Sequence, residues 1–592
     1  MSPPRKSDAA LGTPARRLVK LRIWLSERLR LSEFHVTVLW AGLIGLAGAW
    51  TCAGFKEVTE YLHHIFTGHE GGYIESYRAM PSWRRLLAPA LGGVFAGATL
   101  MLHRRLKTAK SSADYMEAVV VGEGNLSARA SFVKSLSALF SSASGASIGR
   151  EGPLVQLASV VSSLIGRLFH MPMARKRLLV AAGAAAGVAS AYNAPVAGAF
   201  FVAEIVLGSM AVESLAPLVV SSIVATLATR NIYGGEALYS APFFELRSNA
   251  ELLCYLSLGL FSGLIAPAYI RLLKSGEWVF SLLKLPLPLR LGLGGLIVGG
   301  LAIVHPEVVG NGRTLVFSVL HGPVPWAVLA AILACKLLAT TATFGSGAVG
   351  GVFTPTLFTG AATGYLFGVG MAACFPQADF DPRSFALVGM GAFLAAATGA
   401  PVMAIIMLFE LTLSDQVILP AMISSVLAYL LARAIGGRPL YSAALERKGA
   451  AAVAQHLAAM RVDGLMSGDA AVLSPTATFG EVGRAFLQNR HGSIYVVENE
   501  RFLGVISLND IKAYLDQPEL ESLLIARDVM HEDPPQLHPG QGMNEALDLF
   551  SRAERERLPV TAPDGRYLGS VTRADVLLFL AGTPRQVEKR GN

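Results

Sequence analysis

An arginine and a glutamate stand side by side in an otherwise apolar stretch, GASIGREGPLVQ at residues 145–156. Pro153 suits the first turn of a helix, because its missing N–H is not needed there, so we expect a helix to begin at Gly152 or Pro153. A helix start carries unpaired N–H groups and about half a positive charge, and therefore attracts an anion. Glu151 is then a tethered anion that can occupy this site or swing out of it. The pattern predicts that Glu151 is a gate.

A second glycine-rich segment, GSGAVGGVFTPTL at residues 345–357, also leads into a predicted helix. We expect the backbone N–H groups of Val352 and Phe353 to point into the same cavity as the first helix start. The segment contains no lysine, so a phosphate-binding loop is unsupported.

Composition places both motifs in a membrane. The chain has 592 residues, of which 53% are hydrophobic and 16% charged, whereas a soluble chain carries about a quarter charged residues. About a dozen apolar runs between residues 36 and 435 are long enough to cross a bilayer. Others, such as 154–169, are short or interrupted, which predicts broken helices that line a cavity. We therefore expect a polytopic membrane protein that is not an enzyme.

The N-terminal segment 1–32 is basic. Its first 30 residues contain eight lysines or arginines and two acidic residues, without the apolar core of a signal peptide, so we expect it to stay cytoplasmic. The net charge of +8 requires no nucleic-acid partner. No metal site is expected either, because four cysteines lack the spacing of metal ligands: Cys52, Cys254, Cys335 and Cys374.

Two pairs of motifs recur at nearly the same offset, which indicates a duplicated membrane unit. NAPVAGAFFVAE (193–204) resembles GAPVMAIIMLFE (399–410) at an offset of 206 residues, and each ends on a glutamate nine residues after its proline. GREGPLVQL (149–157) matches GVFTPTLFT (351–359) at an offset of 202 residues. Duplicated halves with interrupted helices are typical of transport proteins, whose site lies where the broken helices meet.

The composition changes near residue 444, where the apolar runs end. We predict a transmembrane domain at 33–443, a linker at 444–462 and a separate soluble domain at 463–592.

The soluble domain contains a repeat of its own. FLGVISLNDIKAYL (502–515) resembles YLGSVTRADVLLFL (567–580) at an offset of 65 residues. The two copies, 463–516 and 527–581, each read as a short leading segment, a helix, two strands and a closing helix.

Four ordered motifs carry a resemblance to a known family. GREGP, GAVGGVFTP (347–355), NAPVAGAFFVAE and GGRPLYSA (436–443) together resemble the CLC family of chloride channels and transporters, and the spacing looks most like its ClcB-like bacterial branch. The tail resembles a pair of CBS domains. The resemblance implies a polytopic α-helical fold with an inverted repeat and broken helices, followed by an α+β CBS pair. It also implies a chloride-conducting homodimer in a bacterial inner membrane, with both termini cytoplasmic.

The resemblance also implies roles for particular residues. Glu151 matches the gating glutamate, and Arg150 is expected to give it structural or electrostatic support. The family's first motif falls at KSSAD (110–114), which lacks the usual glycines, so Ser111 is the expected hydroxyl ligand and Ser112 its rival. The implied chloride-binding set is Ser111, Arg150, Glu151, Val352, Phe353 and Tyr441.

The hypotheses about function differ in whether chloride movement is coupled to proton movement. Exchangers of this family commonly carry a second, intracellular glutamate, and its register falls here on Ile205, which cannot titrate. Glu204 is the remaining candidate for a proton pathway, although its match to Glu410 in the repeat favours a structural carboxylate. The pattern favours a passive chloride channel. A Cl⁻/H⁺ antiporter of the same fold and a membrane sensor with little transport are the alternatives.

The CBS-like tail suggests one candidate cofactor, an adenine nucleotide. In CBS pairs a hydroxyl residue followed three positions later by aspartate contacts such a ligand, and the matching residues are Ser507 with Asp510 and Thr572 with Asp575. The alternative is that both aspartates only cap the helices they begin.

Overall fold

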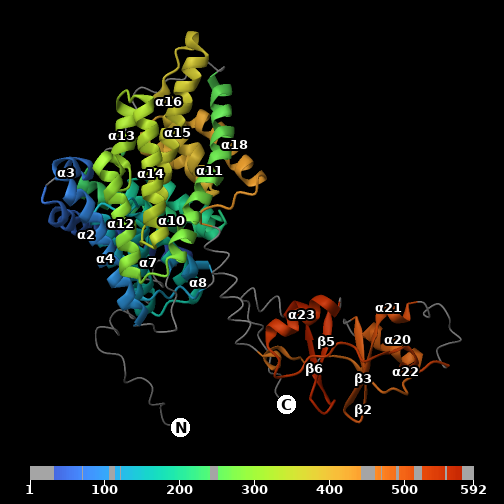
Figure 1. Ribbon diagram of the computed structural model, residues 1–592. Coiled ribbons are helices and arrows are strands. Elements are labelled where there is room, and N and C mark those ends of the chain that lie inside the picture. The colour runs from blue at the N-terminus through green and yellow to red at the C-terminus, as the bar shows by residue number, and fades with distance from the viewer. Residues whose placement is uncertain are drawn as a thin grey trace. The chain divides into compact units, whose positions relative to one another are not determined.

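The computed structural model forms two compact units, Met1–Glu446 and Arg447–Asn592, which are described here one at a time (Figure 1). The described residues are 33–69, 71–105, 114–120, 122–235, 237–239, 251–441, 461–467, 470–488, 492–512, 523–553 and 556–575. The predicted basic tail 1–32 and most of the predicted linker 444–462 lie outside these ranges.

The first unit is helical, as the membrane-like composition predicted. Its elements are α2 (Glu33–Thr67), α3 (Tyr73–Ala79), α4 (Ser82–Arg105), α5 (Tyr115–Val120), α6 (Ala128–Ala143), α7 (Glu151–Leu168), α8 (Met173–Tyr192), α9 (Pro195–Phe201), η1 (Val202–Leu207), α10 (Val212–Tyr233), α11 (Glu251–Leu282), α12 (Leu287–Val304), η2 (Pro306–Val308), α13 (Arg313–His321), α14 (Trp326–Ser346), α15 (Phe353–Cys374), η3 (Pro376–Ala378), α16 (Pro382–Thr398), α17 (Pro401–Thr412) and α18 (Ile418–Ala434).

Seven helices of the described chain are long and apolar enough to cross a membrane: α2, α4, α10, α11, α12, α14 and α15. The two helices that begin at the duplicated Ala-Pro motif are much shorter, with 7 residues in α9 and 12 in α17. The chain is therefore a multi-pass membrane protein, and broken helices mark its duplicated motif, as the sequence predicted.

Close packing of α4 against α12 depends on glycine. A Cβ atom on Gly295 would overlap the carbonyl oxygen of Pro89, and one on Gly93 would overlap the carbonyl oxygen of Leu291. Small residues let the backbones of membrane helices approach this closely, and dispersion contacts then hold the helices together.

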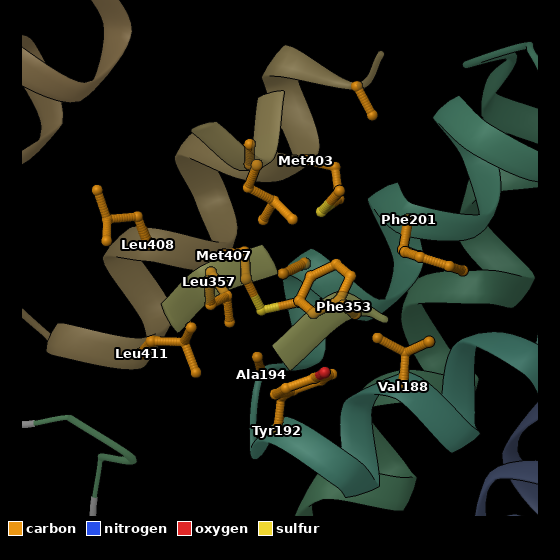
Figure 2. Close-up of a cluster of buried hydrophobic side chains, with 14 of the residues drawn as sticks. Val188, Tyr192, Ala194, Phe201, Phe353, Leu357, Met403, Met407, Leu408 and Leu411 are labelled. Atoms are coloured by element: carbon orange, nitrogen blue, oxygen red, sulfur yellow. The ribbon is translucent and has the colours of Figure 1, made fainter. Parts of the chain in front are cut away.

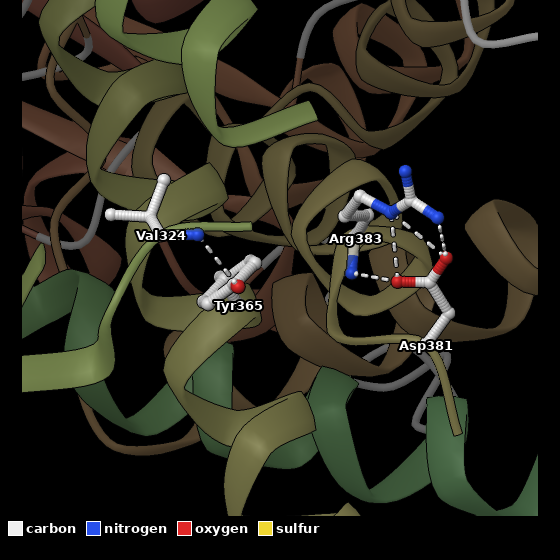
Figure 3. A network of polar contacts seen from close by, with 4 residues as sticks. All are labelled: Val324, Tyr365, Asp381 and Arg383. Atoms are coloured by element: carbon white, nitrogen blue, oxygen red, sulfur yellow. Dashed lines mark hydrogen bonds and ion pairs between the residues drawn. The ribbon is translucent and has the colours of Figure 1, made fainter. Parts of the chain in front are cut away.

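Polar contacts hold the ends of α14, α15 and α16 in place (Figure 3). Asp381 caps α16, because its Oδ1 accepts a hydrogen bond of 2.9 Å from the backbone N–H of Arg383. The Arg383 guanidinium also pairs with the same carboxylate, at 2.8 Å from Nη2 to Oδ2. Nearby, the Tyr365 hydroxyl accepts a bond of 3.2 Å from the N–H of Val324, which ties α15 to the segment before α14.

The second unit is an α+β pair of repeats. Its elements are η4 (Val462–Leu465), β1 (Val472–Leu473), α20 (Phe479–Gln488), β2 (Ser493–Glu498), β3 (Arg501–Ser507), α21 (Leu508–Ile511), α22 (Ala526–Val529), β4 (His531–Glu532), α23 (Met543–Ala553), β5 (Arg557–Thr561) and β6 (Tyr567–Thr572). Strands β1 to β4 form one sheet in that order, and β5 pairs with β6 in another.

The two repeats of this unit exchange their leading segments. Val462 of the first repeat packs into the core of the second repeat, with Leu537 and Phe550. In return, β4 of the second repeat adds to the sheet of the first, beside β3, and Ala526 just before it packs into the core of the first repeat. A single repeat would leave Val462 or Ala526 without its core, so the pair folds as one body.

We expect Gly295→Ala to lower the midpoint of thermal unfolding, because the added methyl group meets the Pro89 carbonyl and overpacking costs about 1–3 kcal/mol. The measurement is a melting curve of the purified protein in detergent. Gly300 lies on the same helix, but its Cβ would come no closer than 4.0 Å to the Leu86 side chain. Gly300→Ala is therefore the matched control, and equal midpoints for the two variants would contradict this account.

Candidate functional site

Two glycines join the helix starts of the two membrane repeats. The N–H of Gly149 donates to the carbonyl of Gly351 at 2.7 Å, and the N–H of Gly351 donates back at 2.8 Å. Gly149 precedes α7 and Gly351 precedes α15, so the two broken helices begin side by side. A Cβ atom on Gly149 would overlap a carboxylate oxygen of Glu151 and lie 2.9 Å from the carbonyl oxygen of Gly351. Only glycine fits at this position.

The first of these helices begins earlier than the sequence predicted. α7 starts at Glu151, with Arg150 as its N-cap residue, and not at Gly152 or Pro153. The reason is that the Arg150 carbonyl already accepts a hydrogen bond of 3.3 Å from the N–H four residues on, at Leu154. Pro153 occupies the third helical position, where its missing N–H is still not needed.

The Glu151 side chain folds onto the joined helix starts and is only 8% exposed. Its Oε1 accepts a hydrogen bond from the hydroxyl of Thr354, in the first turn of α15. Its Oε2 lies beside Gly149 and Gly351, and among the described residues no donor reaches it. The two glycine N–H groups are used by each other, so the carboxylate relies on hydroxyl groups: Thr354 donates to its Oε1, and the Tyr192 hydroxyl also interacts with it.

Two cavities meet at Glu151. The first, which we call the cationic cavity, has a volume of about 210 Å³. It is lined by three cationic side chains, those of Lys56, Arg150 and Arg313, and Glu151 is the only acidic residue among the described ones that line it. The second, which we call the Tyr441 cavity, has a volume of about 350 Å³ and includes both helix starts. Glu151 and Tyr192 line both cavities.

The structure brings together four of the residues predicted to contact chloride. Glu151, Val352, Phe353 and Tyr441 all line the Tyr441 cavity. No acceptor for the N–H of Val352 or Phe353 is found in the described chain, as expected at a helix start. The Phe353 ring lies in a buried cluster drawn from both repeats (Figure 2). Ser111, and its rival Ser112, lie outside the described residues.

Arg150 faces the cationic cavity, and the Tyr441 cavity does not include it. Its guanidinium carbon lies 5.5 Å from the centre of the Tyr73 ring, and its Nη1 is buried with no hydrogen-bond partner in the described chain. Arg150 therefore lines a different cavity from Val352, Phe353 and Tyr441, with which it was predicted to bind chloride.

Glu204, the candidate for a proton pathway, lies in η1 and bonds to the opposite repeat. Its carboxylate accepts hydrogen bonds of 3.3 and 2.7 Å from the N–H groups of Val402 and Met403, at the start of α17. Glu410 in α17 accepts matching bonds of 3.0 and 2.7 Å from two N–H groups at the start of α9. The two duplicated glutamates thus cap each other's helices, which is a structural use of both carboxylates.

In the second unit both predicted aspartates make capping contacts. Asp510 accepts a bond of 2.8 Å from the N–H of Ser507 on one oxygen, and its other oxygen lies 3.1 Å from Nε2 of His531. Burial by itself would raise the pKa of the Asp510 carboxyl. The hydrogen bonds from Ser507 and His531 outweigh burial and hold this pKa below its usual value. Thr572 donates to Asp575 at 2.5 Å, and the N–H of Asp575 donates back at 2.9 Å.

Sequence reasoning missed several polar residues at the site. Thr354 donates a hydrogen bond to Glu151, and the hydroxyl of Tyr192 lies 3.0 Å from Thr354 Oγ1. Both are adjacent to motifs that the sequence singled out, Tyr192 before NAPV and Thr354 within GVFTP, and that position was the available signal. Lys56 and Arg313 stand in segments that no motif marks, so the sequence offered no signal for them.

Comparisons with known proteins agree with this geometry. A family model described as voltage gated chloride channel matches residues 92–433, and a CBS domain model matches 462–517 and 526–582. A chloride channel protein of Ralstonia nicotianae, described as ClcB-like, is 51% identical over 411 residues, which are 69% of this chain and 96% of the relative.

Two solved structures share the fold. The crystal structure of a slow cyanobacterial Cl⁻/H⁺ antiporter matches with a TM-score of 0.62 and 26% identity, over 70% of this chain and 98% of that one. The crystal structure of a eukaryotic CLC transporter matches with a TM-score of 0.58 and 19% identity, over 92% of this chain and 99% of that one.

The fold and the joined helix starts define an anion-transport protein of the inverted-repeat type. The chain belongs to the CLC family of chloride channels and transporters, and it carries a C-terminal pair of CBS domains.

We expect Glu204→Ala and Glu410→Ala each to lower the thermal unfolding midpoint in detergent, because each removes a carboxylate cap with a typical contribution of about 1–2 kcal/mol. Glu213, exposed in α10, provides the control, and Glu213→Ala should melt like the unmodified chain. A Glu204→Ala variant that melts normally but loses proton transport would reverse the assignment and make Glu204 a proton carrier.

Proposed function

We propose that the chain is a passive chloride channel whose gate is Glu151. The observation that carries the proposal is the position of this side chain. Glu151 lines both cavities, and one of its oxygens lies at the paired helix starts, where a permeating anion would be attracted. A carboxylate there competes with chloride for the position beside Gly149 and Gly351, which we call the seat. Protonation or displacement of Glu151 frees the seat.

The surrounding groups suit a permeating anion. The helix starts at Val352 and Phe353 offer partial positive charges, and Tyr441 adds a hydroxyl to the same cavity. Conduction requires binding that is strong enough for entry and weak enough for release. Partial charges and hydroxyls meet this requirement, while a full cation in the seat would hold the ion.

The residue at the position where exchangers carry a second titratable carboxylate favours passive conduction over proton exchange. Ile205 stands where exchangers of the resembled family carry a titratable glutamate, and the neighbouring Glu204 is engaged by two backbone N–H groups. The second candidate is a Cl⁻/H⁺ antiporter, and its support is the fold shared with a cyanobacterial antiporter at 26% identity.

We further propose the assembly and its setting. The chain acts as a homodimer in a bacterial inner membrane, with both termini in the cytoplasm and the CBS pair as a regulatory module. The basic segment 1–32 supports the orientation, because positively charged segments stay on the cytoplasmic side.

Reconstituted protein under combined chloride and pH gradients is expected to show a reversal potential set by chloride alone. Glu151→Gln should then give chloride flux that no longer varies between about pH 4 and 8, because an amide cannot titrate. A reproducible shift of the reversal potential with the pH gradient would establish the antiporter instead. Glu151→Gln flux that keeps the pH dependence of the unmodified protein would reject Glu151 as the gate.

For the CBS pair we propose an adenine nucleotide at the second repeat. Arg557 is buried and stands opposite Thr572 in the β5–β6 register, so a cation suited to a phosphate lies beside the Thr572–Asp575 pair. In the described chain its guanidinium bonds to the Ser570 hydroxyl at 3.2 Å and makes no ion pair.

Calorimetric titration of the full-length protein with ATP and AMP is expected to show binding, weakened by about tenfold or more in Asp575→Ala through loss of a charged hydrogen bond. Asp528 is the matched control, because it is an exposed aspartate that caps α22 through the N–H of Ile525 at 3.0 Å. Asp528→Ala should bind as the unmodified chain does. Absence of binding to the unmodified chain would end the nucleotide proposal.

A further inference from the structure

Three groups form a directed chain of hydrogen bonds that ends on the gate. The Tyr192 hydroxyl lies 3.0 Å from Thr354 Oγ1, and the Thr354 hydroxyl donates to Oε1 of Glu151. An ionised carboxylate only accepts, and a threonine hydroxyl has a single proton, so Thr354 uses its proton on Glu151. The bond between the two hydroxyls must then be donated by Tyr192.

Thr354 differs from the other threonines of α15. The hydroxyls of Thr356, Thr359 and Thr363 donate to the carbonyl four residues earlier on their own helix, at 2.7, 2.8 and 2.7 Å. Thr354, which is 2% exposed, instead points across to the opposite repeat. Thr354 is the second residue of α15, so the carbonyl four residues earlier, at Gly350, precedes the helix, and the hydroxyl bonds to Glu151 instead.

Tyr192 is placed to hold that orientation. It is the last residue of α8, and its ring packs 5.0 Å from the ring of Phe353, the residue before Thr354 (Figure 2). The side chain is 4% exposed. The ring therefore fixes the tyrosine against the first turn of α15, and its hydroxyl can reach Thr354.

We propose that the Thr354 hydroxyl holds the ionised Glu151 carboxylate in the seat, a role that we call the latch. Tyr192 orients this hydroxyl. This inference rests on the proposed role of Glu151 as the gate. The Thr354 hydroxyl donates directly to Oε1 of the carboxylate, while Oε2 receives no bond from the described chain, and a hydrogen bond to a charged acceptor is stronger than one to a neutral acceptor. The latch stabilises Glu151 in its seat while it is ionised, and it weakens when Glu151 takes up a proton.

Other charges also act on Glu151, and the hydroxyl substitutions below leave all of them in place. The titratable and charged groups that line the cationic cavity with it include Lys56, Arg150, Tyr239 and Arg313, and those that line the Tyr441 cavity with it include Asp114, Tyr115, Lys134 and Tyr441.

Thr354→Val is expected to raise the pH of half-maximal chloride flux by about one unit, and to raise flux at neutral pH by up to about tenfold, in liposomes that contain the purified protein. The reason is that the ionised, seated form loses a charge-assisted bond. Thr354→Ser should restore the profile of the unmodified chain. Tyr192→Phe should move the profile in the same direction by a smaller amount, because Thr354 keeps its bond to Glu151.

Thr359→Val is the matched control, because it removes a similarly buried hydroxyl that bonds only within α15. The latch is overturned if Thr354→Val moves the profile no further than this control, or if Thr354→Ser behaves like Thr354→Val. In a Glu151→Gln background, Thr354→Val should add nothing, and an additional effect there would also overturn it.

An infrared measurement separates this inference from the proposed function. The difference between spectra of the unmodified chain and of Glu151→Gln isolates the carboxylate band of Glu151, and its titration needs no transport. A band that shifts in Thr354→Val and returns in Thr354→Ser supports the latch, even if flux shows that Glu151 is no gate. A band that does not move in Thr354→Val rejects the latch, whatever the flux.

Discussion

The membrane unit depends on one pair of backbone hydrogen bonds, between Gly149 and Gly351. Broken helices leave unpaired N–H groups in an apolar environment, where such groups are costly. The glycine pair satisfies one N–H from each broken segment and holds the two helix starts in contact. Because neither residue carries a side chain, the space beside the pair remains open, and Glu151 fills it. The seat is thus a consequence of how the fold joins its halves.

Other contacts around the glycine pair also join the two repeats. Glu204 caps the start of α17, Glu410 caps the start of α9, and the end of α8 contacts the start of α15 through Tyr192. Each contact joins one repeat to the other. A functional site built in this way exists only in the assembled unit, because neither repeat contains a complete set of donors. This explains why the site of a duplicated membrane protein lies at the interface of its repeats.

Sequence patterns predicted the features that local chemistry determines. Gly-Arg-Glu-Gly-Pro signals a helix start, and the matched Ala-Pro and glutamate positions signal a duplication, so the broken helices and the gating candidate could be inferred. Pairing across 203 residues, as between Glu151 and Thr354, leaves no periodic trace. Threonine within an apolar helix usually bonds to its own backbone, as Thr359 does here, so its residue type did not distinguish Thr354. Likewise, a lone glutamate in an apolar run gives no sign of which helix it will cap.

The positions of the charged side chains around Glu151 suit two opposing requirements, which are to attract an anion and to let it leave. Full positive charges lie around the cationic cavity, on Lys56, Arg150 and Arg313, whereas the seat offers backbone dipoles and hydroxyls. Cations set back from the seat raise the local anion concentration over the distance at which charge acts through water. They do so without forming the close contact that would retain an ion. In the described chain Glu151 is the one charged residue that lines both cavities, so a change in one proton alters the field at the point where the two cavities meet.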